Sequence, residues 1–121
     1  MPVIPADTLH FLDLPGRLSA DPVPDGYGMG YSVRVVRVPP GPRNPHRHPA
    51  TDEVTYIAEG RGVAWEDDKG TEVKVGDLLV IPRGIPHATV AHGDTDLVLV
   101  CFFPAGDLAS NLEELPGPLR R

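Results

Sequence analysis

Proline and glycine are distributed through this chain in a way that excludes most helical folds. Fifteen prolines and thirteen glycines separate short runs of apolar residues instead of gathering in one low-complexity block. Proline breaks a helix interior and glycine weakens it, whereas both are common in the turns between strands. No segment with helical periodicity lies between the apolar runs to suggest a crossover helix. The pattern therefore predicts an all-β sandwich or barrel.

The apolar runs predict about seven to nine strands at the spacing expected of such a fold. Most of these runs are rich in β-branched residues or alternate between apolar and polar side chains. The clearest predicted strands cover residues 31–38, 53–58, 63–66, 71–75, 78–81, 87–91 and 96–103. Residues 78–81 contain no polar side chain, so we expect this strand to be buried on both faces.

The length of the chain predicts a single domain. A chain of 121 residues can bury roughly two-thirds of its unfolded surface, which is enough for one core. We expect an N-terminal arm over residues 1–30, a barrel over 31–105, and a C-terminal helical turn and tail over 106–121.

Charge and cysteine content restrict the partners and the compartment. The formal net charge is −6, and no basic cluster is present that would bind nucleic acid or an anionic membrane surface. We therefore expect a small-molecule substrate, no nucleic acid and no membrane. The N-terminus lacks a basic and then apolar signal, and no apolar run approaches the roughly 20 residues of a membrane helix. The lone Cys101 excludes an internal disulfide, so we expect a cytoplasmic protein.

Two histidines and a carboxylate lie close together in the stretch from residue 41 to residue 60. His46 and His48 are two positions apart, so both rings leave the same face if the segment is extended. The turn at residues 49–52 predicts that Glu53 returns on a second strand beside them. A barrel that brings His87 next to this stretch adds a third imidazole. Such a cluster of nitrogen and oxygen donors is typical of a metal site.

The motifs around these residues resemble the two motifs of the cupin superfamily, in the same order. The first motif comprises Gly41, His46, His48, Glu53 and Gly60. The second comprises Gly76, Pro82, Gly84 and His87. Gly41 is one residue closer to the histidines than is usual in the family, and Ala91 occupies a position where asparagine is common. Neither departure affects a proposed ligand.

The resemblance implies a double-stranded β-helix, or jelly-roll barrel, that holds a metal ion. The ligands it implies are His46, His48, Glu53 and His87. Imidazoles and a carboxylate suit Fe, Mn, Ni, Cu or Zn, and four protein ligands leave two positions of a six-coordinate ion for substrate or dioxygen. The resemblance also implies a homodimer formed through the N-terminal arm and one sheet.

Strand parity gives candidates for the walls of a substrate pocket. Thr55 and Ile57 share a strand face with Glu53, and Thr89 shares one with His87. We expect Val80 and Leu99, together with Ile57, to form apolar walls that exclude water.

Other conspicuous side chains receive simpler interpretations. Arg47 is expected to point away from the histidines and to form an ion pair on the outside. His10 and His92 match no ligand position and are expected at the surface. Cys101 lies in an apolar strand and is expected to be an inert core thiol, and Trp65 a core or interface aromatic.

Three function classes remain open at this point. The first is a metalloenzyme with dioxygenase-type chemistry on a chelating, oxygen-bearing substrate. The second is a redox-neutral isomerase, lyase, decarboxylase or dehydratase acting on a sugar-like or keto acid substrate. The third is a non-catalytic, metal-dependent small-molecule binding module. Glu53 is the candidate catalytic residue, either as a permanent ligand, which we favour, or as a carboxylate that leaves the metal to move a proton.

Overall fold

The structure, a computed structural model, describes residues 1–121 and consists almost entirely of β-strands. The strands are β1 (Leu12–Leu14), β2 (Arg17–Ala20), β3 (Ser32–Val38), β4 (His46–Arg47), β5 (Glu53–Glu59), β6 (Arg61–Glu66), β7 (Lys69–Lys74), β8 (Leu78–Ile81), β9 (His87–Ala91), β10 (Leu97–Phe103) and β11 (Glu113–Glu114). Two single-turn 3₁₀ helices, η1 (Ala6–Thr8) and η2 (Ala109–Asn111), lie near the ends of the chain. Neither is long enough or apolar enough to cross a membrane.

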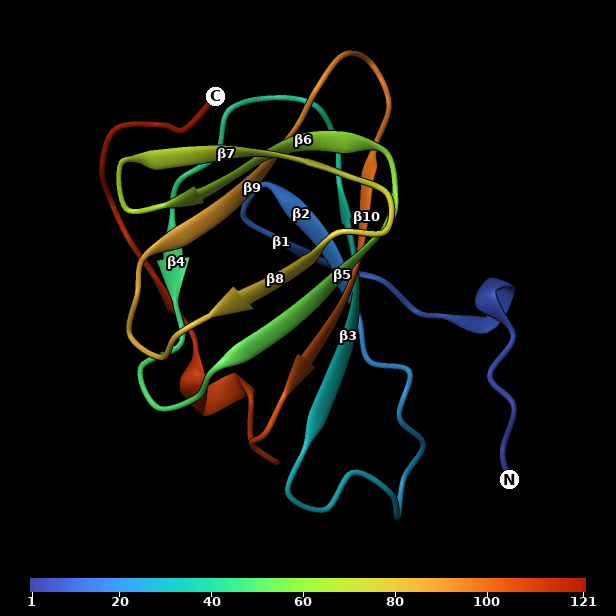
Figure 1. Cartoon of the computed structure of the whole chain (residues 1–121). Helices are drawn as coiled ribbons and strands as arrows, with labels where there is room; N and C mark the ends of the chain where they lie inside the picture. Colours follow the sequence, from blue (N-terminus) through green and yellow to red (C-terminus); the bar gives the residue numbers. More distant parts are fainter.

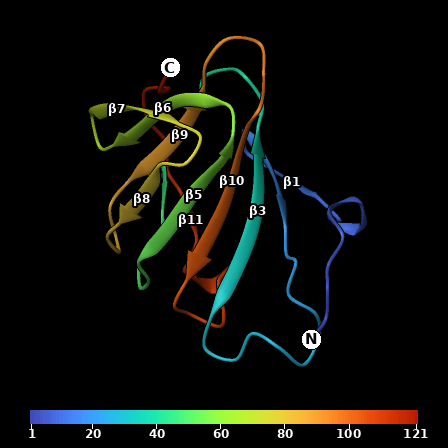
Figure 2. The same cartoon turned by 45° about the vertical axis from the view of Figure 1, so that its right-hand side comes forward.

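The strands form two antiparallel sheets that face each other across the interior of a barrel (Figures 1 and 2). The six-stranded sheet has the order β1-β2-β3-β10-β5-β8, and the five-stranded sheet has the order β11-β4-β9-β6-β7. Consecutive strands often lie in different sheets, as in a jelly roll. The predicted all-β barrel is confirmed.

Alternation of side chains along the strands builds the core between the two sheets. On β5 the inward positions Glu53, Thr55 and Ile57 are buried, while Val54 and Tyr56 between them are exposed. This is the period of two expected for a strand with one face toward the core. The buried apolar cluster comprises Val36, Val38, Ile57, Val73, Ala91, Leu97, Leu99, Cys101, Phe103 and Leu108.

The prediction that residues 78–81 are buried on both faces is wrong. The bounds of β8 are as predicted, but Leu78 is 65% exposed and Val80 is 71% exposed. The strand lies at the edge of the six-stranded sheet, and its outer face has no second layer over it. Val80 is therefore largely exposed: it lines a pocket beside His87, but not the cavity that all four predicted ligands share.

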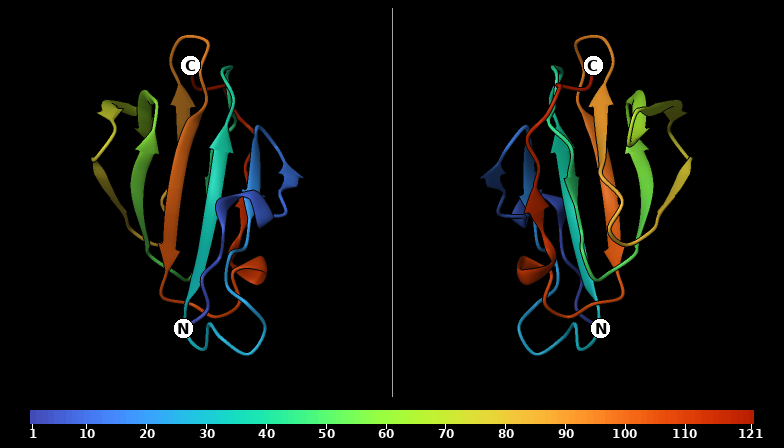
Figure 3. Two further views of the ribbon diagram at one scale, coloured as in Figure 1. Left: turned by 90° about the vertical axis from the view of Figure 1, so that its right-hand side faces the viewer. Right: turned by 90° about the vertical axis from the view of Figure 1, so that its left-hand side faces the viewer.

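The β1–β2 hairpin and the segment after β10 lie along the same side of the barrel (Figure 3). The hairpin β1–β2 extends the first sheet beyond β3, and β11 extends the second sheet beyond β4. An ion pair joins these additions, with Arg17 Nη1 2.8 Å from Glu114 Oε1. Nearby, the backbones of Arg43 and Arg120 exchange hydrogen bonds of 2.9 and 2.7 Å. Residues before β3 and after β10 thus close one side of the interior.

Candidate metal centre

Four potential ligands come together where three strands meet. His46 begins β4, Glu53 begins β5 and His87 begins β9, while His48 directly follows β4. His46 and His87 lie opposite each other in the β4–β9 pair. All four side chains are buried, and one donor atom from each lies within 4.8 Å of the others.

Hydrogen bonds between the two motifs hold this arrangement. The backbone N–H of Gly84, in the turn before His87, donates to the carbonyl of His48 over 2.8 Å. In the same turn, the Arg83 N–H donates to the Asp52 carboxylate over 3.0 Å. The loop of one motif is thereby fixed to the loop of the other, although the two are more than thirty residues apart in the sequence.

Backbone carbonyls orient two of the imidazoles. His48 donates from Nδ1 to the carbonyl of Asn111 over 2.7 Å, and His87 donates from Nδ1 to the carbonyl of Ile85 over 2.9 Å. This arrangement leaves Nε2 of each ring toward the cluster, 3.2 and 3.3 Å from Glu53 Oε1 respectively. Such hydrogen bonds to the second ring nitrogen are usual for metal-ligating histidines.

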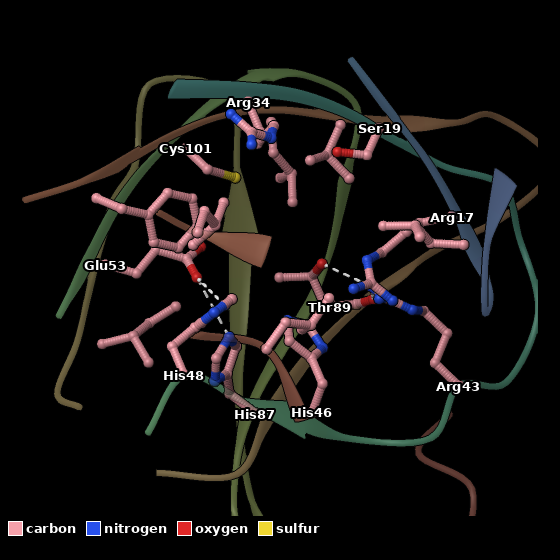
Figure 4. A pocket seen from close by; sticks show the side chains of 17 residues that line it. Arg17, Ser19, Arg34, Arg43, His46, His48, Glu53, His87, Thr89 and Cys101 are labelled. Carbon is pink, nitrogen blue, oxygen red and sulfur yellow. Dashed lines mark hydrogen bonds and ion pairs between the residues drawn. The ribbon is translucent and has the colours of Figure 1, made fainter. Parts of the chain in front are cut away.

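Glu53 is held by its other oxygen. Thr55 donates a hydrogen bond to Glu53 Oε2. The other oxygen, Oε1, faces the His48 and His87 rings (Figure 4). The carboxylate is thus positioned to offer one oxygen to an ion, and the second oxygen is already engaged.

The donor set fits a divalent metal ion. Nδ1 of His46 and Nε2 of both His48 and His87 are buried without a hydrogen-bond partner. Unsatisfied buried nitrogens are costly, and a cation bound by the three imidazoles and Glu53 would engage Nε2 of His48 and of His87. Neutral imidazoles and one carboxylate are ligands that first-row transition metals prefer.

The environment favours the protonation states that metal binding needs. Burial, reinforced by the nearby charges of His87, Arg17 and Arg43, holds the pKa of His46 well below its usual value, so that the ring is neutral. Burial alone would raise the pKa of Glu53, but the adjacent His48 and His87 nitrogens and the hydrogen bond from Thr55 outweigh it and hold this pKa well below the ordinary value.

A cavity of about 100 Å³ adjoins the cluster. It is smaller than the roughly 300–1,000 Å³ of pockets that hold drug-sized ligands, which suits a small substrate. Its apolar lining consists of Leu14, Val36, Ile81, Leu99, Phe103, Leu108 and Leu112. Phe103 packs against the His48 ring at a centroid distance of 4.8 Å, which shields one side of the cluster from water.

The candidate wall residues separate into two groups. Thr89 and Leu99 line the cavity. Thr55 and Ile57 have the predicted inward orientation but are completely buried, Thr55 beneath Glu53 and Ile57 in the apolar core. Parity identified their strand face correctly, but it does not indicate how far along the barrel axis the cavity extends.

Three arginines on the cavity wall were not predicted. Arg17 comes from β2, Arg34 from β3 and Arg43 from the loop before β4 (Figure 4). Arginine is usually exposed, and the proline-rich loop around Arg43 has no alternation from which its orientation follows. Its place three residues before His46, within the first motif, is the one signal that pointed toward the cluster.

The remaining titratable candidates lie as expected. Arg47 points outward and forms an ion pair with Glu113 over 2.9 Å, and His92 contacts Glu72 at the surface over 3.0 Å. Cys101 is a free, buried thiol whose pKa is raised well above its usual value, chiefly by burial. It is therefore a poor nucleophile.

Comparison with known protein families agrees with this geometry. The model of the cupin domain matches residues 34–103, which include all four clustered residues. The chain belongs to the cupin family. The hairpin β1–β2 and strand β11 lie outside the matched segment.

Several cupin relatives resemble the chain over part of their length. A protein of Methanocaldococcus jannaschii without assigned function is 37% identical over 79 residues, 64% of this chain and 63% of that protein. Oxalate oxidase GF-3.8 of Triticum aestivum is 32% identical over 84 residues, 62% of this chain and 38% of the wheat protein. The chain thus spans less than two thirds of the length of either relative.

Solved structures show the same fold. A crystal structure from Thermotoga maritima, described as a predicted oxalate decarboxylase, superposes with a TM-score of 0.74 at 20% identity, over 84% of this chain and 97% of that chain. Other solved structures with this fold include a nucleoside dehydratase and a sugar phosphate isomerase of the cupin superfamily. The fold therefore does not select one reaction.

Proposed function

We propose that this cupin is a metal-dependent enzyme that acts on a small, chelating, oxygen-bearing substrate, with dioxygenase-type chemistry. The observation that supports this most strongly is the convergence of three buried imidazoles and one carboxylate oxygen on a small, largely apolar cavity. His46, His48, Glu53 and His87 would hold the ion. When bound, such an ion supplies Lewis acidity to a substrate oxygen and, if it is redox-active, electrons for reaction with dioxygen.

The other residues of the site restrict the choice of chemistry. Isomerisation and dehydration need a base that moves a substrate proton. Glu53 is tied to Thr55, Cys101 is held as a thiol, and the further ionisable groups on the wall, apart from the three histidines proposed as ligands, are arginines. The cavity therefore offers no free base, which favours oxygen chemistry. The similarity to a wheat oxalate oxidase is in keeping with an oxidising reaction.

The alternative is a redox-neutral isomerase, lyase, decarboxylase or dehydratase acting on a sugar-like or keto acid substrate. Two points support it. The arginines on the cavity wall suit an acidic substrate. Decarboxylation, in addition, needs no base to remove a proton from carbon. In decarboxylation the arginines would orient the acid group, and the apolar lining of the cavity would exclude water.

Oxygen dependence separates these two proposals. Metal-stripped protein is reloaded with each of Fe, Mn, Ni, Cu and Zn and is tested on small diketones, keto acids and dicarboxylic acids, with dioxygen present and absent. Oxygen uptake that needs both metal and substrate supports the first proposal. An equal rate of product formation without oxygen would contradict dioxygenase-type chemistry and support the redox-neutral alternative.

The outer face of the six-stranded sheet supports the expected homodimer. The outward side chains of β5, β8 and β10 form a continuous exposed patch without charge, comprising Val54, Tyr56, Leu78, Val80, Val100 and Phe102. Patches of this kind usually mark an interface. A second copy offers the same uncharged face, so that two chains of net charge −6 meet there without like-charge repulsion at the contact.

The homodimer is tested by the molar mass in solution. Wild type is expected to sediment as a dimer, and Val80→Asp as a monomer with an unchanged circular dichroism spectrum. A monomeric wild type, or a dimer that persists in Val80→Asp and in Leu78→Asp, would contradict the proposed interface.

A further inference from the structure

Arg43 is a buried guanidinium without an acidic partner. Arg43 as a whole is only 3% exposed. Nη1 donates to the carbonyl and the hydroxyl of Thr89 over 2.8 and 3.2 Å, but Nε and Nη2 are buried without any hydrogen-bond partner. Burial, together with repulsion from Arg17, lowers its pKa to about 10, so that the group remains a cation at neutral pH. Buried charges without compensation are rare because they are costly.

The surroundings of Arg43 fix its position on the cavity wall. Its guanidinium lies beside that of Arg17 and across the cavity from Glu53 (Figure 4). The turn before β2 packs over the stem. Gly16 has a φ of +71°, and a Cβ at this position would lie 3.1 Å from both Cγ and Nε of Arg43. The backbone pairing with Arg120 holds the residue from the other side. The guanidinium is therefore preorganised.

The charges around the cavity do not balance within the chain. Arg17 is neutralised by Glu114, and Arg34 lies 3.3 Å from Asp21. Arg43 forms no ion pair. A divalent ion on His46, His48, Glu53 and His87 would add further positive charge, since Glu53 supplies one negative charge against two. The complementary ligand is an anion.

We propose that Arg43 anchors a carboxylate-binding subsite, and that the substrate is a small organic acid whose carboxylate lies between this guanidinium and the metal cluster. This inference rests on the proposed function and specifies its substrate class. Nε lies against the turn at Gly16, so Nη2 is the donor left for a carboxylate oxygen, in a charge-assisted hydrogen bond on the cavity wall. Arg17 contributes a second positive charge from the hairpin β1–β2, outside the segment that matches the cupin domain.

Binding of simple acids to the zinc-loaded protein tests this subsite without turnover, since Zn²⁺ has no redox chemistry. Oxalate, malonate and succinate are titrated calorimetrically, with malonamide as the uncharged analogue of malonate. The variants are Arg43→Met and Arg43→Lys, and the matched control is Arg47→Met, which removes an exposed arginine on the outside of the same segment. Zinc content is measured for every protein.

We expect at least one acid to bind wild type and Arg47→Met equally well and to bind much more tightly than malonamide. In Arg43→Met its dissociation constant should rise about 10- to 100-fold, the value of one charge-assisted hydrogen bond, with unchanged zinc content. The dissociation constant of Arg43→Lys should lie between those of wild type and Arg43→Met, because lysine keeps the charge but not the planar guanidinium. Equal binding by Arg43→Met, or no preference of wild type for acids over malonamide, would show that Arg43 is purely structural.

Failure of the metal proposal gives a different result. If wild type takes up no zinc, the proposed function is contradicted. Acid binding to the metal-free protein that is lost in Arg43→Met would still support the subsite, because the guanidinium is present without the ion. If the metal-free protein binds no acid, or binds acids equally well in Arg43→Met, the proposed subsite is contradicted.

Discussion

The two walls of the cavity are built from different parts of the chain and by different means. The metal wall comes from β4, β5 and β9, within the matched cupin segment, and its four donors are fixed by motif spacing. The opposite wall combines Arg43 with Arg17, which forms an ion pair with Glu114 near the other end of the chain. The first wall is recognisable as a family property. The second depends in part on terminal additions to the shared barrel, because Arg17 and Glu114 lie outside the matched segment.

The walls also differ in how they respond to pH. His46 and Glu53 have lowered pKa values and take up protons under acidic conditions. Arg43, with a pKa of about 10, keeps its charge throughout the neutral and acidic range. A change in pH therefore acts on the metal wall and leaves the arginine wall unchanged, which makes the two separable by experiment.

Removal of one ligand is expected to have the largest effect. His48→Ala should weaken Zn²⁺ binding by more than about 100-fold, since loss of an outer partner of a ligand alone commonly costs 10–100-fold. Competition with a chromophoric chelator measures this affinity. Arg43→Met, on the opposite wall, should bind Zn²⁺ within about threefold of wild type. Similar losses in both variants would mean that the walls are not independent.

The stability of the metal-free protein should fall in acid because of the metal wall. Below about pH 6.5, the ordinary pKa of histidine, His46 is protonated in the unfolded chain but stays neutral in the native protein. Unfolding therefore becomes more favourable as pH decreases. The slope is at most about 1.4 kcal/mol per pH unit for this group. Glu53 acts in the same direction at lower pH, where its lowered pKa is reached.

Urea unfolding of the metal-free protein between pH 8 and pH 5 measures this slope. His46→Gln should flatten the profile near pH 6, whereas Arg43→Met should keep most of the wild-type slope, because burial lowers the His46 pKa more than the charge of Arg43 does. A profile that His46→Gln leaves unchanged would rule out a buried neutral His46 as the cause.

The smallest effect is expected for the stability of Arg43→Met. Methionine fills similar space and removes a buried charge that no carboxylate compensates, so the free energy of unfolding should stay the same or rise. Arg17→Met instead leaves Glu114 without its partner and should lose roughly 1 kcal/mol. A loss of more than about 2 kcal/mol in Arg43→Met would indicate that its hydrogen bonds to Thr89 are structural.

Parity predicted the inward face of β5 well, because a strand leaves few choices for a side chain. Glu53, Thr55 and Ile57 all point inward, and Arg47 points outward to Glu113 as expected. The same rules failed for β8. An entirely apolar run suits a buried strand and an exposed interface strand equally, and sequence does not reveal which strand lies at an edge.

The arginine wall could not be predicted from local pattern. Arg43 lies in a loop bounded by prolines, where no period links sequence to orientation. Arg17 becomes a cavity residue only because β2 pairs with β3, and the β1–β2 hairpin is too short to be recognised with confidence from its residues. Burial without a partner, which marks Arg43 as unusual, is visible only in the folded chain.

The central claim is that three imidazoles and one carboxylate bind a single divalent ion. The X-ray absorption spectrum at the zinc edge of the loaded and dialysed protein tests it most directly. We predict nitrogen and oxygen neighbours at about 2.0–2.2 Å, with outer-shell scattering from three imidazole rings that decreases in His48→Ala. Zinc that is lost on dialysis, or a spectrum without imidazole scattering, would contradict the claim.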